Sequence, residues 1–526
     1  MKRFGKLLSI FMVLIMVLSG CGADSGSSGT GSGGSSGDPK AVGTDSGTAG
    51  SAVDTESAAA KDTGGQGAAG ELEKIVMVYP CEAPADQQMV VDAVNKISSE
   101  LIGVTVETIP INFSNYANQL NLMLTSNEQI DLFAVPANLF TTFASAGHLL
   151  DIGDLLATDG KGIVDTIGAT YLEAGKVGGH QYAVTTNRDL AKGFGFGIVN
   201  EIAERNNIDI SAIKTLEDMG NALAIIKENE PDVVPFVADV SMPPSLRLSD
   251  VDQLGDTYGV LMNMGESLEV VNYFETEEYK ALIGTFRDWY EKGYISEDHV
   301  TSNANYTEAI KAGMGFSYIQ TTKPGIDKEE SSKVGKDITV VTIVDEFATT
   351  TAPQTLQWAI ANKSQVPEAT MKFMNLMYTN ADIMNLFAWG VEGVHYQVLP
   401  DGQIDYPDGV DANNSGYNLR RGWSFGNQFL TYIWVGDSPT LWEEMDAFNK
   451  NAKVSKAFGF TFDSSQVQTE YAAVTNVVNE YRAALEFGLL DPDTALKEYN
   501  EKLAEAGLDK IIAAKQEQLD AWTKGQ

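Results

Sequence analysis

The amino-acid sequence predicts an α/β protein of two lobes followed by a helical extension. Segments with strand and helix periodicity alternate from residue 71 onward, which is typical of a parallel sheet covered by helices. The chain has 526 residues, more than the roughly 250–300 that share one hydrophobic core, so two packed lobes are expected. Amphipathic helical patterns dominate the chain after residue 456.

The N-terminus has the pattern of an export signal. Lys2, Arg3 and Lys6 precede an uncharged apolar run over 7–19, which is shorter than the about 20 residues that span a bilayer. We therefore expect a cleaved signal peptide over 1–20. The sequence Leu-Ser-Gly-Cys that ends at Cys21 resembles a bacterial lipobox, in which this thiol carries a diacylglyceryl group. The alternative is an ordinary signal peptide with a chance cysteine.

A flexible linker is predicted over 21–70. Residues 22–70 are mainly Gly, Ser, Ala, Thr and Asp and contain no aromatic residue, Leu, Ile or Met. Such a composition cannot bury enough apolar surface to offset the entropy lost on ordering. The folded part should begin near Glu71, tethered through the lipid to the extracytoplasmic face of a cell membrane.

Composition excludes several partners. Lys and Arg number 36 against 72 Asp and Glu, a net charge of −36, which disfavours nucleic acid and anionic membrane surfaces. The lipid is then the only expected contact with the membrane. Of the two cysteines, a lipidated Cys21 leaves Cys81 without a disulfide partner, and its place after an apolar run predicts a buried position.

The first lobe begins with a β-α-β-α-β pattern. Strands are expected over 75–79, 104–108 and 130–135, with amphipathic helices over 89–101 and 116–124 between them. Parallel sheets bind ligands beyond the carboxyl ends of their strands. Tyr79 and Phe133 end two of these strands, so we expect both to face one ligand crevice.

The next motifs carry a family resemblance. Asp131-Leu132-Phe133 is followed by Leu150-Asp151-x-x-Asp154-Leu155-Leu156 and by Gly179-x-x-Tyr182-Ala183-Val184. Together they resemble the first lobe of the family 1 extracellular solute-binding proteins, the receptors of carbohydrate ABC importers. The resemblance implies a two-lobed periplasmic-binding-protein-like fold, type II-like, with a hinge between the lobes. It also places the crossing to the second lobe at 193–200, which is apolar and glycine-rich.

The second lobe reads as mainly helical. Thr215 can cap one helix, and a second helix is expected over 279–290. Strands are expected over 314–319 and 338–344, returning toward the hinge. A chain that leaves a lobe and later returns makes a hinge of several strands, which suits bending about a cleft.

The chain after Trp358 resembles a narrower branch of the family. Trp358-Ala359-Ile360-Ala361-Asn362, Gly390-Val391-Glu392-Gly393 and Trp423-Ser424-Phe425-Gly426-Asn427 are similar to the LplA-like lipoproteins of Gram-positive bacteria, which carry a C-terminal helical extension. Here helices are expected over 467–485, from Pro492 to Gly507, and over 511–522. They could dock on a lobe or mediate dimerisation. We expect docking and a monomer.

These patterns divide the chain into six parts. They are a signal peptide (1–20), a lipidated cysteine with a flexible linker (21–70), a first α/β lobe (71–195), a second, mainly helical α/β lobe (196–345), a return to the first lobe with the hinge and tryptophan-rich cleft elements (346–455), and a C-terminal helical extension (456–526).

Tryptophans are concentrated where the chain returns to the first lobe. Five of the seven fall between Trp358 and Trp442. A sugar ring packs its C–H face on an aromatic ring, and its hydroxyls need polar side chains nearby. Each tryptophan could equally be a core residue. Arg188 and Asp189 could form a structural salt bridge, and Glu392 and His395 could support a turn. The candidate ligand-binding residues are Tyr79, Phe133, Asn187, Arg188, Asp189, Trp358, Trp389, Glu392, Trp423 and Trp434.

Other kinds of site find little support. The four histidines lack zinc-binding spacing, and the acidic loop over 401–415 lacks the calcium-loop register, so we expect a solvated hairpin and neither metal nor cofactor. A phosphate-binding loop is also absent, which assigns any ATPase to a separate chain.

The predicted function is a lipid-anchored substrate-binding protein that captures a carbohydrate, an oligosaccharide, and delivers it to ABC permease subunits. It is not expected to be an enzyme. One alternative is a surface glycoside hydrolase or lyase. Another is the same fold binding a peptide or an acidic oligosaccharide, for which Arg188, Arg420 and Arg421 could supply positive charge.

Overall fold

The computed structural model describes residues 72–302, 305–350, 352–417 and 420–524. The predicted signal peptide (1–20), Cys21 and the linker (21–70) lie outside these residues. Within the described part, no helix is both long enough and apolar enough to cross a membrane.

The first lobe is built on a five-stranded sheet in the order β2-β1-β3-β13-β6. Strands β1 (Glu73–Pro80), β2 (Val104–Ile111) and β3 (Leu132–Pro136) are parallel, and β13 (Leu356–Ile360) runs antiparallel to β3 and to β6 (Val184–Thr185). The predicted β-α-β-α-β pattern is confirmed, with β13 returning from a distant part of the chain.

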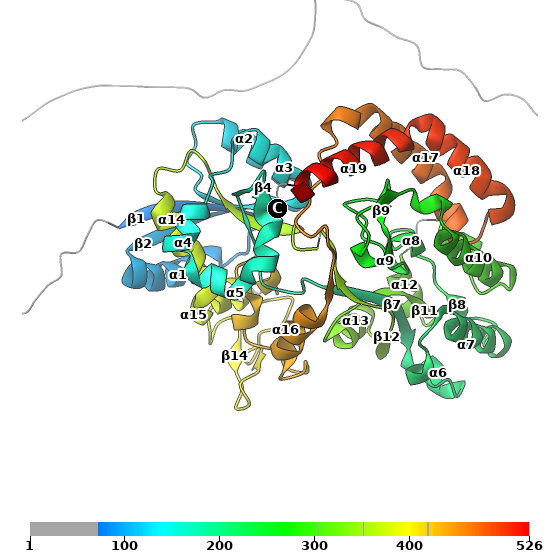
Figure 1. Cartoon of the computed structure of the whole chain (residues 1–526). Coiled ribbons are helices and arrows are strands. Elements are labelled where there is room, and N and C mark those ends of the chain that lie inside the picture. The colour runs from blue at the N-terminus through cyan, green and yellow to red at the C-terminus, as the bar shows by residue number, and fades with distance from the viewer. Residues whose placement is uncertain (1–71, 303–304, 351, 418–419, 525–526) are drawn as a thin grey trace, which may run out of the picture. The chain divides into compact units, whose positions relative to one another are not determined.

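Helices cover both sides of this sheet. Helix α1 (Gln87–Ile102) and helix α2 (Phe113–Thr125) lie on opposite sides of β1 and β2 in Figure 1, as right-handed crossovers require. Helix α14 (Pro367–Thr379) packs beside α1. Helix α1 ends at Gly103, whose φ of 69° is the left-handed conformation that glycine adopts without strain.

Buried polar groups fix the register of this lobe. The carboxylate of Asp131 accepts a hydrogen bond from the N–H of Val76 at 2.8 Å, and the phenol of Tyr116 donates to the carbonyl of Ala134 at 2.6 Å. Cys81 is buried and free, as predicted. The other elements of this part are α3 (Ala137–Ser145), α4 (Gly153–Thr158), α5 (Lys161–Leu172), β4 (Lys176–Val177), β5 (His180–Gln181), α15 (Ala381–Trp389), β14 (Gln397–Val398), β15 (Ile404–Asp405) and α16 (Leu441–Asn451).

The second lobe has its own five-stranded sheet, in the order β16-β12-β7-β11-β8. These strands are β7 (Lys192–Val199), β8 (Val234–Phe236), β11 (Gly315–Thr322), β12 (Ile338–Ala348) and β16 (Lys453–Val454). The predicted strands over 314–319 and 338–344 are confirmed as β11 and β12.

The position predicted for the crossing between the lobes is wrong. Residues 193–200, expected to cross, form most of the central strand β7, so the predicted domain boundary at 195/196 falls inside a strand. The glycines are explained by close packing instead. A Cβ on Gly195 would lie 1.8 Å from the carbonyl oxygen of Val341, and one on Gly197 would lie 2.5 Å from the ring of Tyr318.

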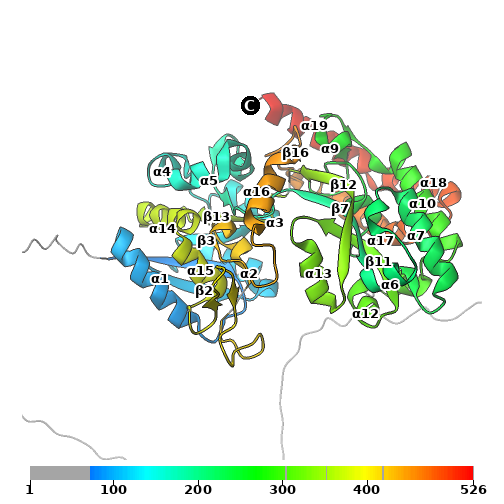
Figure 2. The same ribbon diagram turned by 90° about the horizontal axis from the view of Figure 1, so that it is seen from below.

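Helices surround the second sheet. Thr215 caps α7 (Leu216–Asn229) in a reciprocal capping box with Asp218, and α10 (Glu277–Glu291) contains the second predicted helix. Figure 2 shows α13 (Ile326–Val334) beside β12 and α12 (Tyr306–Lys311) beside β11, and both pairs are in contact. The remaining elements are α6 (Asn200–Arg205), α8 (Pro244–Arg247), β9 (Val260–Leu261), α9 (Met262–Gly265), β10 (Val270–Val271) and α11 (Glu297–Thr301).

The C-terminal helices dock on a lobe, as predicted, and the structure shows that this is the second lobe. Helices α17 (Gln468–Glu486), α18 (Pro492–Ala506) and α19 (Leu508–Lys524) lie beside α10 and β9 in Figure 1. Their apolar faces share a core with buried residues between 251 and 283. Within it, the ammonium of Lys515, 0 % exposed, lies 2.6 Å from the carboxylate of Asp256.

Candidate ligand-binding site

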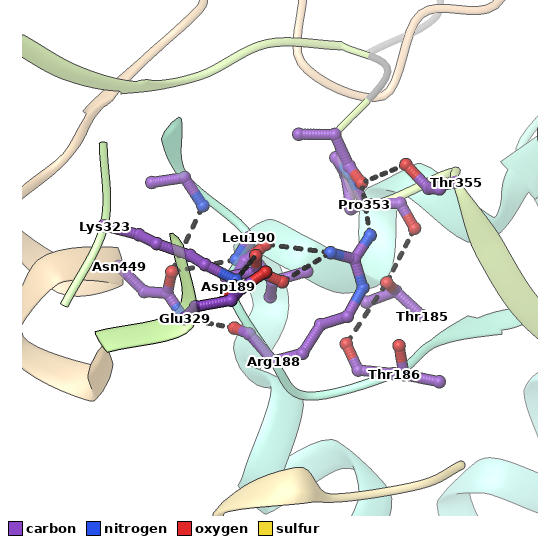
Figure 3. A network of polar contacts seen from close by, with 12 residues as sticks. Thr185, Thr186, Arg188, Asp189, Leu190, Lys323, Glu329, Pro353, Thr355 and Asn449 are labelled. Atoms are coloured by element: carbon purple, nitrogen blue, oxygen red, sulfur yellow. Dashed lines mark hydrogen bonds and ion pairs between the residues drawn. The ribbon is translucent and has the colours of Figure 1, made fainter. Parts of the chain in front are cut away.

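The chain passes between the two sheets around residues 186–191, and Arg188 is fixed there. Its side chain is 4 % exposed, and the guanidinium donates to the carboxylate of Asp189 at 2.6 Å and to the carbonyl of Ala352 at 3.1 Å (Figure 3). Asp189 also pairs with Lys323 at 3.3 Å. The alternative interpretation of Arg188 and Asp189, a structural salt bridge, is therefore the one that the structure shows. The guanidinium of Arg188, which was predicted to bind ligand, is buried in this contact.

The charge of Asp189 is stabilised by its neighbours. Burial raises the pKa of this carboxyl, but the positive charges of Lys323, Arg188 and Lys192 outweigh burial and hold the pKa below its ordinary value. The group is thus a permanent anion at neutral pH.

Asn449, near the end of α16, holds the segment 186–191 in place through hydrogen bonds. Its side-chain oxygen accepts hydrogen bonds from the N–H groups of Leu190 at 2.9 Å and Ala191 at 3.1 Å, and its amide donates to the carbonyl of Arg188 at 2.6 Å (Figure 3). Thr185 ties this region to Pro353 at 2.6 Å. Three distant parts of the chain thus meet here, and a lone asparagine late in the sequence gave no sign of this role.

Three of the predicted ligand-binding residues lie in the core of the first lobe. Tyr79, Phe133 and Trp358 are buried, and the indole of Trp358 donates to the carbonyl of Ser424 at 3.1 Å. Phe425 packs on the ring of Tyr79 with 5.3 Å between centroids. The segment that carries Phe425 covers the carboxyl end of β1, so these rings offer no open face in this structure.

An exposed aromatic surface lies just beyond that segment. Arg421 donates to the carbonyl of Pro80 at 2.6 Å, and its guanidinium carbon lies 4.7 Å from the ring centroid of Phe113 and 5.5 Å from that of Trp423. Phe113 is 58 % exposed and begins α2, directly after the carboxyl end of β2. We call Phe113, Arg421 and Trp423 the first-lobe aromatic surface.

A second aromatic cluster contains Trp389 and Trp434. Their ring centroids are 5.4 Å apart, and the guanidinium carbon of Arg420 lies 4.5 Å from the ring centroid of Trp434. Trp389 is only 9 % exposed, and its indole nitrogen is buried without a hydrogen-bond partner among the described residues. Trp434 is partly exposed and receives the edge of Tyr406 at 4.7 Å.

The other predicted residues have separate surroundings. Glu392 is exposed. His395 is buried and supports the turn, because its ring accepts from the N–H of Val391 at 2.9 Å while its other nitrogen lies 3.3 Å from Asp86. Asn187 donates to the side chain of Asn427 at 2.9 Å.

The second lobe contains a polar pocket of about 450 Å³ near the crossing. Tyr306 lines the pocket and stacks on Tyr318, which lies behind it, with 3.9 Å between the ring centroids. Both phenols donate to the buried carboxylate of Glu330, at 2.7 and 2.9 Å. Burial, together with this carboxylate, raises the pKa of both phenols far above their ordinary range. Of the residues predicted from the sequence to bind ligand, only Asp189 belongs to its lining. Its lining is Asp189, Lys192, Asp239, Ser241, Met242, Asn305, Tyr306, Thr307, Gln320, Thr321, Lys323, Ile326, Glu329, Glu330 and Lys333.

Metal-ligand side chains do not gather in the described part of the chain. No group of three or more His, Cys, Asp or Glu residues there is arranged to hold an ion.

Comparison with known proteins gives the family. Residues 99–384 match the family described as bacterial extracellular solute-binding protein, which is more than half of the chain. The chain belongs to this family. Residues 456–524, which include the three C-terminal helices, match a domain of unknown function, DUF3502.

Relatives of this solute-binding protein come from Streptococcus pneumoniae. A carbohydrate ABC transporter substrate-binding protein of serotype 4 is 26% identical over 462 residues, covering 87% of this chain and 92% of that one. The crystal structure of the N-glycan transport solute-binding protein NgtS is 25% identical, with a TM-score of 0.77 over 86% of this chain and 99% of that chain. NgtS in complex with Man1GlcNAc is 26% identical, with a TM-score of 0.66 over 86% and 100%.

The predicted resemblance and the two-lobed α/β fold of a solute-binding protein are confirmed. In this solute-binding protein, the first-lobe aromatic surface combines the exposed ring of Phe113 with the partly buried ring of Trp423, of which only Trp423 was predicted. Phe113 is the first residue of α2, which follows the parallel strand β2, and no motif in the sequence marks it.

Proposed function

We propose that this solute-binding protein captures an oligosaccharide at the carboxyl edge of its first-lobe sheet and delivers it to an ABC permease. The observation that carries the proposal is the first-lobe aromatic surface, where the 58 % exposed ring of Phe113 lies beside Trp423 and Arg421. An exposed ring held by a cation provides the apolar platform that the C–H face of a sugar needs. The relatives that transport carbohydrates and N-glycans support the same ligand class.

The first test is a binding screen combined with a product assay. The soluble protein from Glu71 onward is tested by thermal shift with Man1GlcNAc, mannotriose, maltotriose, trigalacturonate and a tripeptide, and each sample is then analysed for ligand breakdown. An intact neutral sugar that raises the melting temperature with concentration supports the proposal, because only ligands of the folded state stabilise it. Turnover of a sugar would support the glycosidase or lyase alternative instead.

The tether and the partners are part of the proposal. We expect the diacylglyceryl group on Cys21 to hold the protein at the extracytoplasmic face, and the linker over 21–70 to let a monomer reach the permease, whose ATPase is a separate chain. The C21A variant should appear in the medium rather than in the membrane fraction. Retention of C21A in the membrane would contradict lipid anchoring.

The alternative of an acidic oligosaccharide rested on positive charge from Arg188, Arg420 and Arg421, and the structure weakens this argument. Arg188 is enclosed and paired with Asp189, so it is not available to a carboxylate ligand. Arg420 and Arg421 lie over aromatic rings. Trigalacturonate in the screen tests this alternative directly.

A further inference from the structure

Lys192 begins strand β7 and lines the polar pocket of the second lobe. Its ammonium has no hydrogen-bond or ion-pair partner among the described residues. The other two lysines of the pocket are paired: Lys323 with Asp189 at 3.3 Å and Glu329 at 3.0 Å, and Lys333 with Glu330 at 3.3 Å. Lys192 is therefore the cation of this wall that is left to interact with a ligand.

The surroundings of Lys192 make an incoming oxygen favourable. Burial lowers the pKa of its ammonium to about 8, the nearby charges of Arg188, Arg247 and Lys323 act in the same direction, and Asp189 opposes them. Lys192 is partly exposed, so water can reach its ammonium in the empty pocket. An acceptor that displaces this water must offer the ammonium a hydrogen bond in its place, and a sugar oxygen can do so.

The same pocket offers an acceptor in Asp239. One oxygen of this carboxylate accepts from the N–H of Ser241 at 2.9 Å and from its hydroxyl at 2.6 Å. The other oxygen accepts only a long bond of 3.4 Å from the N–H of Tyr306 among the described residues. That oxygen can accept a further hydrogen bond from a ligand hydroxyl.

The charge of the wall selects against anions. Four carboxylates line the pocket, Asp189, Asp239, Glu329 and Glu330, against the three ammonium groups of Lys192, Lys323 and Lys333. An acidic ligand placed between Lys192 and Asp239 would bring a second negative charge next to the Asp239 carboxylate, and like charges at such a short distance repel. A neutral polyol can donate to Asp239 and accept from Lys192 without that repulsion. The volume of about 450 Å³ is in the range of small-ligand sites.

We propose that this pocket is a second-lobe subsite for a neutral, hydroxyl-rich sugar unit, with Lys192 donating to a sugar oxygen and Asp239 accepting from a sugar hydroxyl. The proposal rests on the oligosaccharide-binding function above and names the chemistry by which the second lobe selects its ligand. The two lobes then have different roles. The first lobe supplies an apolar platform for the sugar ring, and the second lobe forms hydrogen bonds with the sugar hydroxyl groups.

The test is calorimetric titration of the wild type and of variants with Man1GlcNAc, mannotriose, maltotriose and trigalacturonate. K192M and K192Q should each weaken binding of the neutral sugar at least tenfold. The matched control is K227M, an exposed lysine of α7 in the same lobe, which should change affinity less than twofold. The melting temperature of each empty variant shows whether it is folded.

The D239N variant distinguishes the ligand classes. For a neutral sugar, the loss of a strong acceptor should weaken binding about tenfold. For trigalacturonate, the loss of a negative charge should instead strengthen binding.

Each outcome has a defined meaning. Neutral-sugar binding that is unchanged in both Lys192 variants overturns this inference and leaves the proposed function standing. A wild type that prefers trigalacturonate overturns the neutral subsite. A wild type that binds none of the four sugars contradicts the proposed function itself, and the inference with it.

Discussion

The guanidinium of Arg421 lies over the ring of Phe113, with 4.7 Å between its central carbon and the ring centroid. Because the same guanidinium donates to the carbonyl of Pro80 at 2.6 Å, its position is set by the end of strand β1. The cation therefore orients an exposed ring at the sheet edge where parallel sheets bind ligands.

The F113A variant should lose ligand affinity without losing stability. Removing a stacking platform costs about 1–2 kcal/mol of binding free energy, roughly 5- to 30-fold in affinity. The exposed ring contributes little to the free energy of unfolding, because it stays in contact with water in the folded state. Titration calorimetry and thermal unfolding of the empty protein measure the two effects. The control is L122A, which removes an apolar side chain 66 % exposed on the same helix α2. Equal binding by F113A and L122A would remove Phe113 from the site.

The G195A variant should be strongly destabilised. The added methyl group would overlap the carbonyl of Val341, 1.8 Å away, and the backbone of strand β12 would have to move. We expect a loss of about 3 kcal/mol in the free energy of unfolding, measured with urea. The matched control is G284A on α10, where a Cβ meets nothing within 4 Å, and which should gain about 0.5–1 kcal/mol from helix propensity. Similar effects of the two changes would contradict the close approach of β7 and β12.

Glu486 should make stability depend on pH. Burial raises the pKa of this carboxyl from 4.5 to about 7, despite hydrogen bonds from Ser245. Because the folded state holds the proton more tightly, the stabilisation is complete below about pH 4.5 and is lost as the pH rises through about 7.

The E486Q variant removes that titration. Its free energy of unfolding relative to the wild type should therefore rise between pH 5 and pH 8, by up to about 3 kcal/mol. Urea unfolding at several pH values gives the difference between the two curves. A difference that is constant over this range would show that Glu486 does not titrate there.

Asn449 should matter for both stability and binding. The N449A change leaves the N–H groups of Leu190 and Ala191 without their acceptor in a buried position, which should cost about 2–3 kcal/mol of unfolding free energy. Because these groups lie on a passage between the sheets, the ligand affinity should fall as well. N121A, on the exposed face of α2, is the control for removal of an asparagine side chain. A variant that loses neither property would exclude a hinge role.

The order of elements could be predicted because periodicity and end signals are local. Gly103 ends α1, Thr215 caps α7 and Gly507 ends α18, each by a rule that needs only nearby residues. The crossing between the lobes could not be placed from the sequence. The glycines of β7 are needed because β11 and β12 pack closely against it, and these strands lie more than a hundred residues away in sequence. Composition alone made this strand look like a linker.

The candidate site was harder to predict for a related reason. Tyr79 and Trp358 were chosen for ring type and strand position, but the segment around Phe425 folds over both. Phe113 and Lys192 carry no motif, and their exposure or lack of a partner follows only from what surrounds them. Residue type suggested the chemistry of the site, whereas burial decided which residues can take part.

The shared core of the C-terminal helices has a consequence for biosynthesis. Tyr273 and Tyr279 are buried against α17 and α18, which follow them in the chain only after the rest of the second lobe. The middle of the second lobe therefore stays incomplete until these helices have been made, and a chain that stops before them leaves the two rings uncovered. Such a chain exposes apolar surface, which makes it prone to aggregate.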